Sequence, residues 1–387
     1  MTDRIGIDYT SAVHQTAGIG RYTREMVKAL AQCSAGQVSP PQYRLFVAEA
    51  GRCAPPPDLG PNFSWHPTRI TERWLGRLWY RLHLPLPIER WTGPLDLFHA
   101  ADFVLRPTRP GTRTLLTVHD LSFVREPDSV MPGMSRHLNR WVRQSVAQAD
   151  HVIAVSKATA QDLIELYRTP PEKISVLYHG VTPEFRPNDD PAQRAAIRDK
   201  YNLGRQPFIL SVGTIQPRKN YQRLIQAFAQ VKAEADLVIA GGPGWHADDI
   251  YNEVTRQQLT DRVHFLGFVP DTDLPLLYSA AALFVYPSLY EGFGLPALEA
   301  MACGTPVVAA NRSALPEVVG SAGLLVDPFD VEAIAAAIDT VLHDSRLHQS
   351  LLQAGLAQAA QFSWTKMAGE LVQIYQKLLT EDKVVTE

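Results

Sequence analysis

The chain has 387 residues, of which 45% are hydrophobic and 20% are charged, and its formal net charge is −3. This length suits two domains rather than one core, and a near-neutral charge without a basic block argues against nucleic acid as a partner. Three scattered cysteines, charged first residues and the lack of any apolar run near the roughly 18 residues of a membrane span indicate a cytoplasmic protein, attached at most to a membrane surface.

Short apolar stretches of β type alternate with amphipathic helical patterns along the whole chain. In the first half, the predicted strands are residues 4–9, 43–49, 95–102, 112–120, 151–156 and 174–180. In the second half, they are residues 207–214, 237–243, 263–269, 282–288, 306–310 and 323–328. This alternation is typical of doubly wound parallel sheets that are buried on both faces. We therefore predict an α/β fold with two Rossmann-like domains that face a cleft.

The two halves meet near residues 178–191, where prolines and an Asn-Asp-Asp cluster follow a strand pattern. We predict an N-terminal domain of residues 1–182 and a C-terminal domain of residues 183–363. The tail, residues 364–387, begins with an amphipathic helix that suits packing on either domain. Because ligands of such sheets bind at the carboxyl ends of strands, we expect the functional residues just after strands.

The stretch YEGFGLPALEAMACGTPVVAA, residues 290–310, holds two glutamates on either side of a glycine-rich bend. Glu291 lies before the bend, and Glu299 lies in a short helix that Pro296 begins and Gly304 ends. The N–H groups of the first helical turn form an anion site, and a carboxylate beside a phosphate bound there would be repelled by it. The glutamates therefore suit the hydroxyl groups on either side of a diphosphate, as in a nucleotide sugar. On spacing alone, a turn residue and a surface glutamate explain them equally well.

Three further motifs place candidate residues after predicted strands. Arg218 and Lys219 follow a strand of the second half and open a helix, so two cations lie where phosphates bind, although a solvated Arg-Lys pair explains this motif better when it is taken alone. Gly18 and Gly20 lie in a predicted loop after the first strand, where tight turning explains them as well as ligand approach does. His119 lies at the end of a strand, where a histidine is more often structural.

Together these stretches resemble the retaining glycosyltransferases of family GT4, which have the GT-B fold. Residues 290–310 resemble the E-x7-E signature of that family, and SVGTIQPRKNYQRLIQAF (211–228) resembles its phosphate-binding strand, loop and helix. AGIGRYTREMVKAL (17–30) resembles its N-terminal glycine loop. FSWTKMAGELVQIYQKLL (362–379) resembles its final helix, which in GT-B proteins crosses back to the first domain. The resemblance covers nearly the whole chain.

The resemblance implies a role for each part of the E-x7-E stretch. Glu291 would contact the transferred sugar, and Glu299 would contact the ribose. Backbone amides around Gly294 and Leu295 would hold the diphosphate.

The resemblance also implies that Lys219, with Arg218 beside it, neutralises the diphosphate leaving group. Many family members have an arginine where this chain has Thr214. One phosphate-binding arginine of the family is therefore missing, and we expect Arg218 to matter more here.

In the first domain, the resemblance implies that the loop of Gly18 and Gly20 faces the donor phosphates. Arg21 and Tyr22 would border the acceptor. His119 would contact the transferred sugar.

The activity implied by the resemblance is transfer of a hexosyl group from a nucleotide sugar to an acceptor hydroxyl, with retention. In this family the leaving phosphate accepts the proton of the acceptor as the new bond forms, and this chain shows no pair of glycosidase carboxylates. GIDYTSAVHQTAGIGRY, HDLSF and GTIQPRKN are most similar to bacterial mannosyltransferases of O-antigen or exopolysaccharide assembly. That similarity favours GDP-mannose over UDP-sugars as the donor, and a glycan or lipid-linked acceptor.

We expect neither a cofactor nor a metal, because Asp271 and Asp273 suit capping of the following helix better than metal binding. Three alternatives stay open. A nucleotide-sugar epimerase or hydrolase shares the two-domain architecture but would need a hydrolytic site. A dinucleotide oxidoreductase would need a GxGxxG motif followed by an acidic residue. A non-catalytic protein that binds nucleotide sugars would not need its cations and glutamates intact.

The segment RITERWLGRLWYRLHLPLPIERW, residues 69–91, combines arginines and tryptophans with few acids. As a helix, it would present an apolar face of Trp74, Leu75, Leu78, Trp79 and Leu82, beside a basic face of Arg73, Arg77 and Arg81. Interfacial membrane helices have this composition, although an ordinary helix packed on the first domain explains it as well. We hypothesise that the segment docks the first domain on the inner face of the cytoplasmic membrane and brings a lipid-linked acceptor to the cleft.

Overall fold

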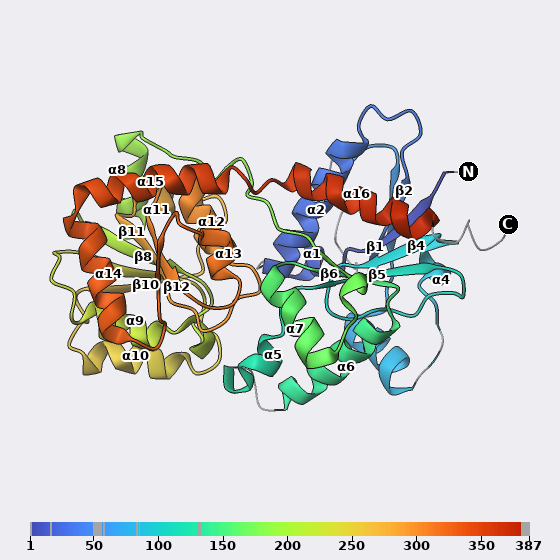
Figure 1. The fold of residues 1–387 in the computed structure, drawn as a ribbon, viewed down its shortest axis with the longest axis horizontal. Helices are drawn as coiled ribbons and strands as arrows, with labels where there is room; N and C mark the ends of the chain where they lie inside the picture. The colour runs from blue at the N-terminus through green and yellow to red at the C-terminus, as the bar shows by residue number, and fades with distance from the viewer. Residues whose placement is uncertain are drawn as a thin grey trace. The chain divides into compact units, whose positions relative to one another are not determined.

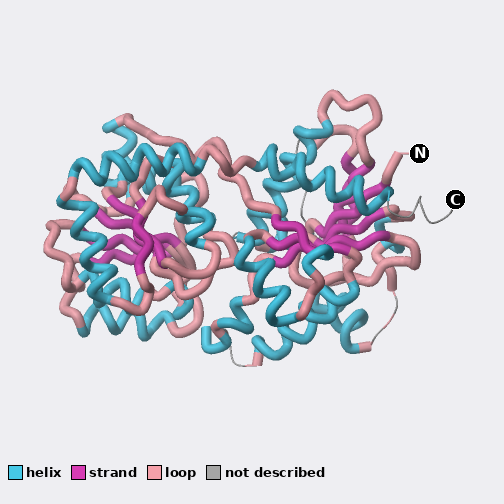
Figure 2. The backbone as a smooth tube through the Cα atoms, viewed as in Figure 1, coloured by secondary structure: helices cyan, strands magenta, loops and turns pink. Residues whose placement is uncertain are grey.

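The structure is a computed structural model that describes residues 2–15, 18–48, 56, 59–82, 84, 86–129 and 133–380. The chain forms two compact units. The first unit comprises Met1–Leu121, Arg136–Gly180 and Ser363–Glu387, and the second comprises Ser122–Ser135 and Val181–Phe362. Each unit contains one parallel sheet with helices on both sides of its strands (Figures 1 and 2).

The sheet of the first unit has the order β3-β2-β1-β4-β5-β6-β7, and all neighbouring strands are parallel. Its strands are β1 (Arg4–Asp8), β2 (Gln42–Val47), β3 (Phe63–Pro67), β4 (Leu97–Ala100), β5 (Arg113–Val118), β6 (His151–Ala154) and β7 (Ile174–Val176). The six strands predicted in this half are confirmed, and β3 was not predicted. Its helices are α1 (Thr10–His14), α2 (Gly18–Ser34), α3 (Glu72–Gly76), η1 (Arg77–Arg81), α4 (Glu89–Thr92), α6 (Met134–Gln148), α7 (Lys157–Tyr167), η3 (Pro171–Lys173) and α16 (Trp364–Thr380).

The final helix α16 completes the core of the first unit. It lies beside α2 on one face of the sheet (Figure 1). Six of its side chains, Trp364, Met367, Ala368, Leu371, Tyr375 and Leu378, belong to the same buried cluster as residues of β1 and α2. Residues 381–387 of the predicted tail lie outside the described residues.

The sheet of the second unit has the order β10-β9-β8-β11-β12-β13 and is also fully parallel. Its strands are β8 (Phe208–Val212), β9 (Asp236–Ala240), β10 (Val263–Gly267), β11 (Leu283–Tyr286), β12 (Val307–Ala310) and β13 (Leu324–Val326). All six were predicted. Its helices are α5 (Ser122–Arg125), η2 (Pro127–Ser129), α8 (Pro191–Lys200), η4 (Pro217–Lys219), α9 (Tyr221–Phe228), α10 (Ala247–Arg256), α11 (Leu274–Ala280), α12 (Leu295–Ala302), α13 (Leu315–Val319), α14 (Val331–His343) and α15 (Ser345–Ala359).

Both sheets have the strand order of doubly wound dinucleotide-binding folds. With the second unit counted from β8, its order is 3-2-1-4-5-6, and the first unit has the same order with one further strand. The order reverses between β8 and β11, and between β1 and β4. In such sheets, ligands bind beyond the carboxyl ends of the strands at this reversal.

The segment 69–91 is not one helix. It contains α3 and the π-helical turn η1, ends its helical run at Arg81, and resumes only at α4. Pro85 and Pro87 follow in the sequence and are incompatible with a helix interior. The predicted apolar face is divided, because Leu75 and Trp79 are buried whereas Trp74 is 55% exposed. Residues 83 and 85 and the side chain of Arg81 are not described.

None of the helices in the described part of the chain combines the length and hydropathy needed to cross a lipid bilayer.

Candidate active site

The strongest candidate site lies at the strand-order reversal of the second sheet. Strands β8 and β11 are neighbours there, with Leu283 paired to Ile209. The chain after β8 carries Arg218 and Lys219, and the chain after β11 carries Glu291. The topology therefore brings together residues that are 72 and 73 positions apart in the sequence.

Glycines and one asparagine shape the loop after β8. Gly213 has a φ of +151°, and a Cβ on Gly241 would lie 1.9 Å from the Gly213 carbonyl oxygen. The loop then forms the 3-10 turn η4, which Pro217 begins. Asn220 follows in a left-handed conformation, with φ of +61°, and its Nδ2 donates to the carbonyl oxygens of Pro287 and Pro328. These bonds fix the turn against the chain that leaves β11 and β13.

Lys219, Arg218 and Glu291 form one hydrogen-bonded cluster. Lys219 Nζ lies 2.7 Å from Glu291 Oε1, and it donates to the hydroxyl of Tyr286 at 2.6 Å. Arg218 Nη1 lies 3.1 Å from Glu291 Oε2 and 2.6 Å from the carbonyl oxygen of Tyr290. The side chains of Lys219 and Glu291 are 10% and 9% exposed. The cluster is thus nearly withdrawn from water.

The charges in the cluster hold Glu291 ionised. Burial disfavours the charged form and would raise the pKa of Glu291, but the positive charges of Lys219 and Arg218 outweigh it and lower the pKa to about 2. Burial and the Glu291 charge raise the pKa of Tyr286 well above its ordinary value, so its phenol is neutral. Two cations beside one carboxylate leave one positive charge in surplus, which suits an anionic group.

The helix α12 begins at the glycine-rich bend, as predicted. Gly294 has a φ of +108°, and a Cβ at this position would lie 2.6 Å from Leu315 Cδ2, so both conformation and space favour glycine. Pro296 lies in the first turn and Cys303 follows the last residue of the helix. Glu299 lies inside the helix and is 3% exposed, with its Oε2 accepting a bond from the Tyr278 hydroxyl at 3.1 Å.

The E-x7-E stretch has partners that the sequence did not reveal. Ser313 Oγ accepts a hydrogen bond from the backbone N–H of Glu291 at 2.8 Å. Tyr286 and Tyr278 contact Lys219 and Glu299. Tyr286 is the last residue of the strand before the motif, so its position in the sequence could have predicted it as a site residue. Ser313 and Tyr278 come from other elements, and no sequence pattern links them to the motif.

The structure corrects the placement of the N-terminal glycines. Gly18 and Gly20 are not in a loop, because they form the first turn of α2. A Cβ on Gly20 would lie 2.0 Å from the Gln15 carbonyl oxygen, so Gly20 permits close packing of the chain on itself. A Cβ on Gly18 would meet no described atom within 4 Å, so Gly18, unlike Gly20, has open space beside it. Ala17 lies outside the described residues.

Tyr22 cannot border an open acceptor site as it stands. Its side chain is fully buried, and its hydroxyl lies 3.3 Å from Thr117 Oγ1. The ring packs edge-on against His119, with centroids 4.8 Å apart. Tyr22 therefore packs against the His119 ring from inside the core and helps to fix its orientation.

His119 follows β5 and is neutral. Its Nε2 lies 2.9 Å from the carbonyl oxygen of Ala101, which only accepts, so Nε2 carries the proton and Nδ1 is an acceptor. Burial lowers the pKa of His119 and outweighs the opposing effects of Asp102, Ala101 and Asp120. An uncharged acceptor of this kind suits a sugar hydroxyl.

Two further buried histidines of the first unit were missed. His99 bonds to Tyr375 and to Thr117 at 2.8 Å each, and burial lowers its pKa to about 3. Burial also lowers the pKa of His179 well below its usual value, and its ring stacks on Trp364. Both side chains come from strand ends and meet residues of α16, which no local pattern indicates.

No group of three His, Cys, Asp or Glu side chains is placed to hold a metal ion among the residues that the structure describes. Asp273 is the N-cap residue of α11, as predicted, but its side chain makes no capping bond to the helix. It accepts bonds from Lys200 Nζ at 2.6 Å and from the Tyr201 hydroxyl at 2.5 Å instead.

Solved structures of other proteins share this fold. Sucrose-phosphate synthase from Thermosynechococcus elongatus aligns with a TM-score of 0.77 at 24% identity, over 98% of this chain and 99% of that one. WaaG, a glycosyltransferase involved in lipopolysaccharide biosynthesis, aligns with a TM-score of 0.72 at 19% identity, over 96% and 99% of the two chains. The fold is therefore GT-B.

Sequence relatives extend the match. The O-antigen chain mannosyltransferase B of Escherichia coli is 38% identical over 286 residues, which are 73% of this chain and 74% of that protein. The serotype-specific mannosyltransferase WbdA of Escherichia coli is 35% identical over 243 residues, but these are only 29% of that longer protein. Family models described as Glycosyltransferase Family 4 and Glycosyl transferases group 1 match residues 16–185 and 193–358. With both halves matched and a relative aligned over most of its length, the chain belongs to the family 4 glycosyltransferases.

Proposed function

We propose that the protein is a retaining mannosyltransferase that moves mannose from GDP-mannose to a hydroxyl of a glycan or lipid-linked acceptor in surface polysaccharide synthesis. The names of its Escherichia coli relatives support the mannosyl group and the O-antigen context. Membership in a glycosyltransferase family argues against the epimerase and oxidoreductase alternatives.

The observation that carries the proposal is the buried cluster of Lys219, Arg218 and Glu291 at the strand-order reversal. In the proposed complex, Lys219 and Arg218 face the diphosphate, whose negative charge grows as it leaves. Glu291 accepts hydrogen bonds from hydroxyls of the transferred sugar. Its pKa of about 2 keeps it an acceptor at any physiological pH.

The remaining site residues take roles that their surroundings favour. Backbone amides of Gly294 and Leu295, at the start of α12, hold the diphosphate. Glu299 accepts from the ribose, in addition to its bond from Tyr278. Gly18 faces the donor phosphates. Gly20 does not contact them but lets the first turn of α2 pack closely on the preceding chain. His119 accepts a bond from the transferred sugar through Nδ1.

The proposed reaction occurs on one face of the sugar. The bond between the anomeric carbon and the phosphate oxygen breaks while the acceptor oxygen bonds to the same carbon. The acceptor proton passes to the leaving phosphate, so the products are GDP and a mannosylated acceptor of unchanged anomeric configuration. The protein supplies positioning and stabilisation of charge, and it needs no general base for this step. No metal or cofactor enters the proposal.

A donor panel tests the proposal. GDP-mannose, GDP, UDP-glucose and UDP-galactose are compared for thermal stabilisation and for slow donor hydrolysis, followed by transfer to candidate acceptors and NMR of the product anomer. We expect GDP-mannose to be turned over and the α configuration to be kept. Turnover of a UDP-sugar alone would refute the donor, and an inverted product would refute the mechanism. Tight donor binding without hydrolysis or transfer would favour a non-catalytic binding protein.

We also propose that residues 69–91 contact a membrane through their exposed part. Trp74, Leu82 and Leu84 are 55%, 61% and 42% exposed, and the guanidinium of Arg77 lies 4.8 Å from the Trp74 ring. An exposed tryptophan with an arginine stacked on it suits the headgroup region. This surface is smaller than the sequence suggested, because Leu75 and Trp79 belong to the core.

A further inference from the structure

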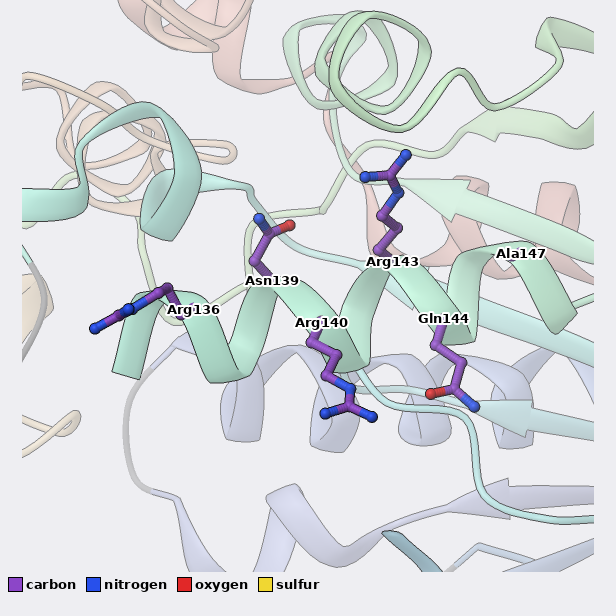
Figure 3. A pocket seen from close by; sticks show the side chains of 6 residues that line it. All are labelled: Arg136, Asn139, Arg140, Arg143, Gln144 and Ala147. Carbon is purple, nitrogen blue, oxygen red and sulfur yellow. The ribbon is translucent and has the colours of Figure 1, made fainter. Parts of the chain in front are cut away.

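A second basic surface lies on helix α6 of the first unit. A shallow hollow along this helix is lined by Arg136, Asn139, Arg140, Arg143, Gln144 and Ala147 (Figure 3). These positions recur every three or four residues and so form one stripe of the helix. Val142, Ser145 and Val146 lie on the opposite side and are buried. The stripe is therefore the solvent face of a helix whose other face is packed.

The stripe carries positive charge only. All three of its arginines are exposed, and α6, MSRHLNRWVRQSVAQ, contains no acidic residue. Lys173 adds a cation at the end of the helix, where its Nζ donates to the Ala147 carbonyl oxygen at 3.0 Å. Asp150, two residues beyond the helix, is held by Arg113 and Thr114. The stripe therefore has an unbalanced positive field, which attracts anions.

The arginines do not converge on one point. In Figure 3, Asn139 and Arg143 extend to one side of the helix, Arg140 and Gln144 extend to the other, and Arg136 points along its start. A single phosphate ion would need donors aimed at one position. Side chains that splay over a stripe instead suit many anionic groups spread over a surface.

An aromatic residue accompanies the charges. Trp141 is half-buried on the same helix, its Nε1 donates to His137 Nε2 at 2.8 Å, and the Arg140 guanidinium lies 5.7 Å from its ring. Tryptophan beside arginine is the pairing found at the headgroup level of membranes.

The stripe is connected to the exposed part of residues 69–91 within the first unit. The Leu105 N–H donates to Ser145 Oγ on α6 at 3.0 Å. The next residue, Arg106, pairs with Glu72 at 3.2 Å and lies 5.2 Å over the Trp79 ring. Two adjacent residues thus tie α6 to α3 and η1.

We propose that the solvent face of α6 docks on an anionic lipid bilayer, with Arg136, Arg140 and Arg143 binding phospholipid headgroups. This surface would be the one from which a lipid-linked acceptor is presented to the site. The role of the acceptor rests on the proposed function, whereas docking on the bilayer does not. Docking through α6 adds to the contact through Trp74 and does not depend on it.

Vesicle co-sedimentation tests the docking surface without any donor or turnover. The full chain is mixed with phosphatidylcholine vesicles, with or without one third phosphatidylglycerol, at low and high salt. Three variants are compared: Arg136→Gln/Arg140→Gln/Arg143→Gln, Arg73→Gln/Arg77→Gln, and the matched control Arg205→Gln/Lys232→Gln/Arg346→Gln, whose exposed cations lie on the second unit. Melting temperatures and GDP affinity establish that each variant is folded.

We expect the wild type to bind only anionic vesicles and to be released by salt. Each basic residue near an anionic surface contributes about a factor of five, so the α6 variant should partition on the order of 100-fold less while the control binds normally. Equal binding of the α6 variant and the wild type would overturn the proposal. Release by inorganic diphosphate, at a phosphate concentration equal to that of the lipid, would also overturn it, since it would indicate a site for single anions. Neither outcome bears on glycosyl transfer, which is measured separately.

Discussion

Replacing Lys219 with methionine tests the centre of the proposed site. The substitution keeps most of the side-chain volume and removes the charge that lies 2.7 Å from Glu291. Glu291 then keeps Arg218 as its cation, so its pKa should rise from the value of about 2. The matched control is Arg218→Met, which also removes one cation from the same carboxylate.

The structure sets the size of the two effects. The pKa of Glu291 falls from 4.5 to about 2, which corresponds to about 3 kcal/mol in favour of its ionised form, and Lys219 contributes more to this than Arg218 does. In turnover, loss of a buried cation that meets developing charge costs roughly 2–4 kcal/mol, or about 30- to 900-fold in kcat. Arg218 is more exposed, at 16%, and we expect its loss to cost about tenfold.

The assay is GDP release from GDP-mannose with acceptor, expressed per folded protein from circular dichroism melts, with GDP affinity measured by calorimetry. A large fall in kcat for Lys219→Met, and a smaller one for Arg218→Met, is the expected result. Equal and small effects of the two substitutions would refute the assignment of Lys219 to the leaving group. A fall in activity that merely follows the unfolded fraction would refute it as well.

Three further predictions follow from the same contacts. Glu299→Gln should weaken GDP binding in calorimetry, whereas Glu291→Gln should leave GDP affinity nearly intact and lower transfer; the reverse pattern would exchange their roles. Gly20→Ala should destabilise the first unit, because its Cβ would lie 2.0 Å from a carbonyl oxygen, whereas Gly18→Ala should melt normally and lose donor affinity; equal melting of both would contradict the packing. Burial lowers the pKa values of His99, His119 and His179, so the unfolded chain binds protons that the folded chain does not as pH falls from about 7 to about 5. The free energy of unfolding should fall over that range by up to about 4 kcal/mol per pH unit, and urea titrations that give a constant value would contradict this.

Most of the fold was predictable because the inner strands of both sheets are buried on both faces. Such strands read as continuous apolar runs, and each run of this kind in the sequence became a strand. Strand β3, Phe63–Pro67, was not predicted because its sequence FSWHP contains no continuous apolar run and ends in proline, unlike the other edge strands. The prediction of one helix over residues 69–91 was wrong because it rested on helical periodicity alone. That periodicity does not show where proline ends the helix, nor which of the apolar side chains the rest of the unit buries.

The candidate site was predictable where its residues are close in sequence. Arg218 and Lys219 are adjacent and follow a strand, and the two glutamates share one stretch, so local chemistry and family resemblance were enough to find them. Contacts between elements were not predictable in this way. Asp273 accepts a hydrogen bond from Lys200, which is 73 positions away, instead of capping the backbone of α11. Which of these two partners Asp273 binds can be seen only in the three-dimensional structure.

The place of α16 near the end of the chain decides which of the two units can complete its core first during synthesis. The first unit needs Trp364 and five further side chains of this helix in its core, but the rest of the unit ends at Gly180. At typical elongation rates of about 5–20 residues per second, the intervening 182 residues, Val181–Phe362, take roughly 10–40 s. During that time, the nascent first unit exposes the apolar surface of α2 that α16 will cover, whereas the last core residue of the second unit, Leu351, is made before α16 begins. Cotranslational folding should therefore finish the second unit first, and the first unit is the part of the nascent chain most in need of a chaperone.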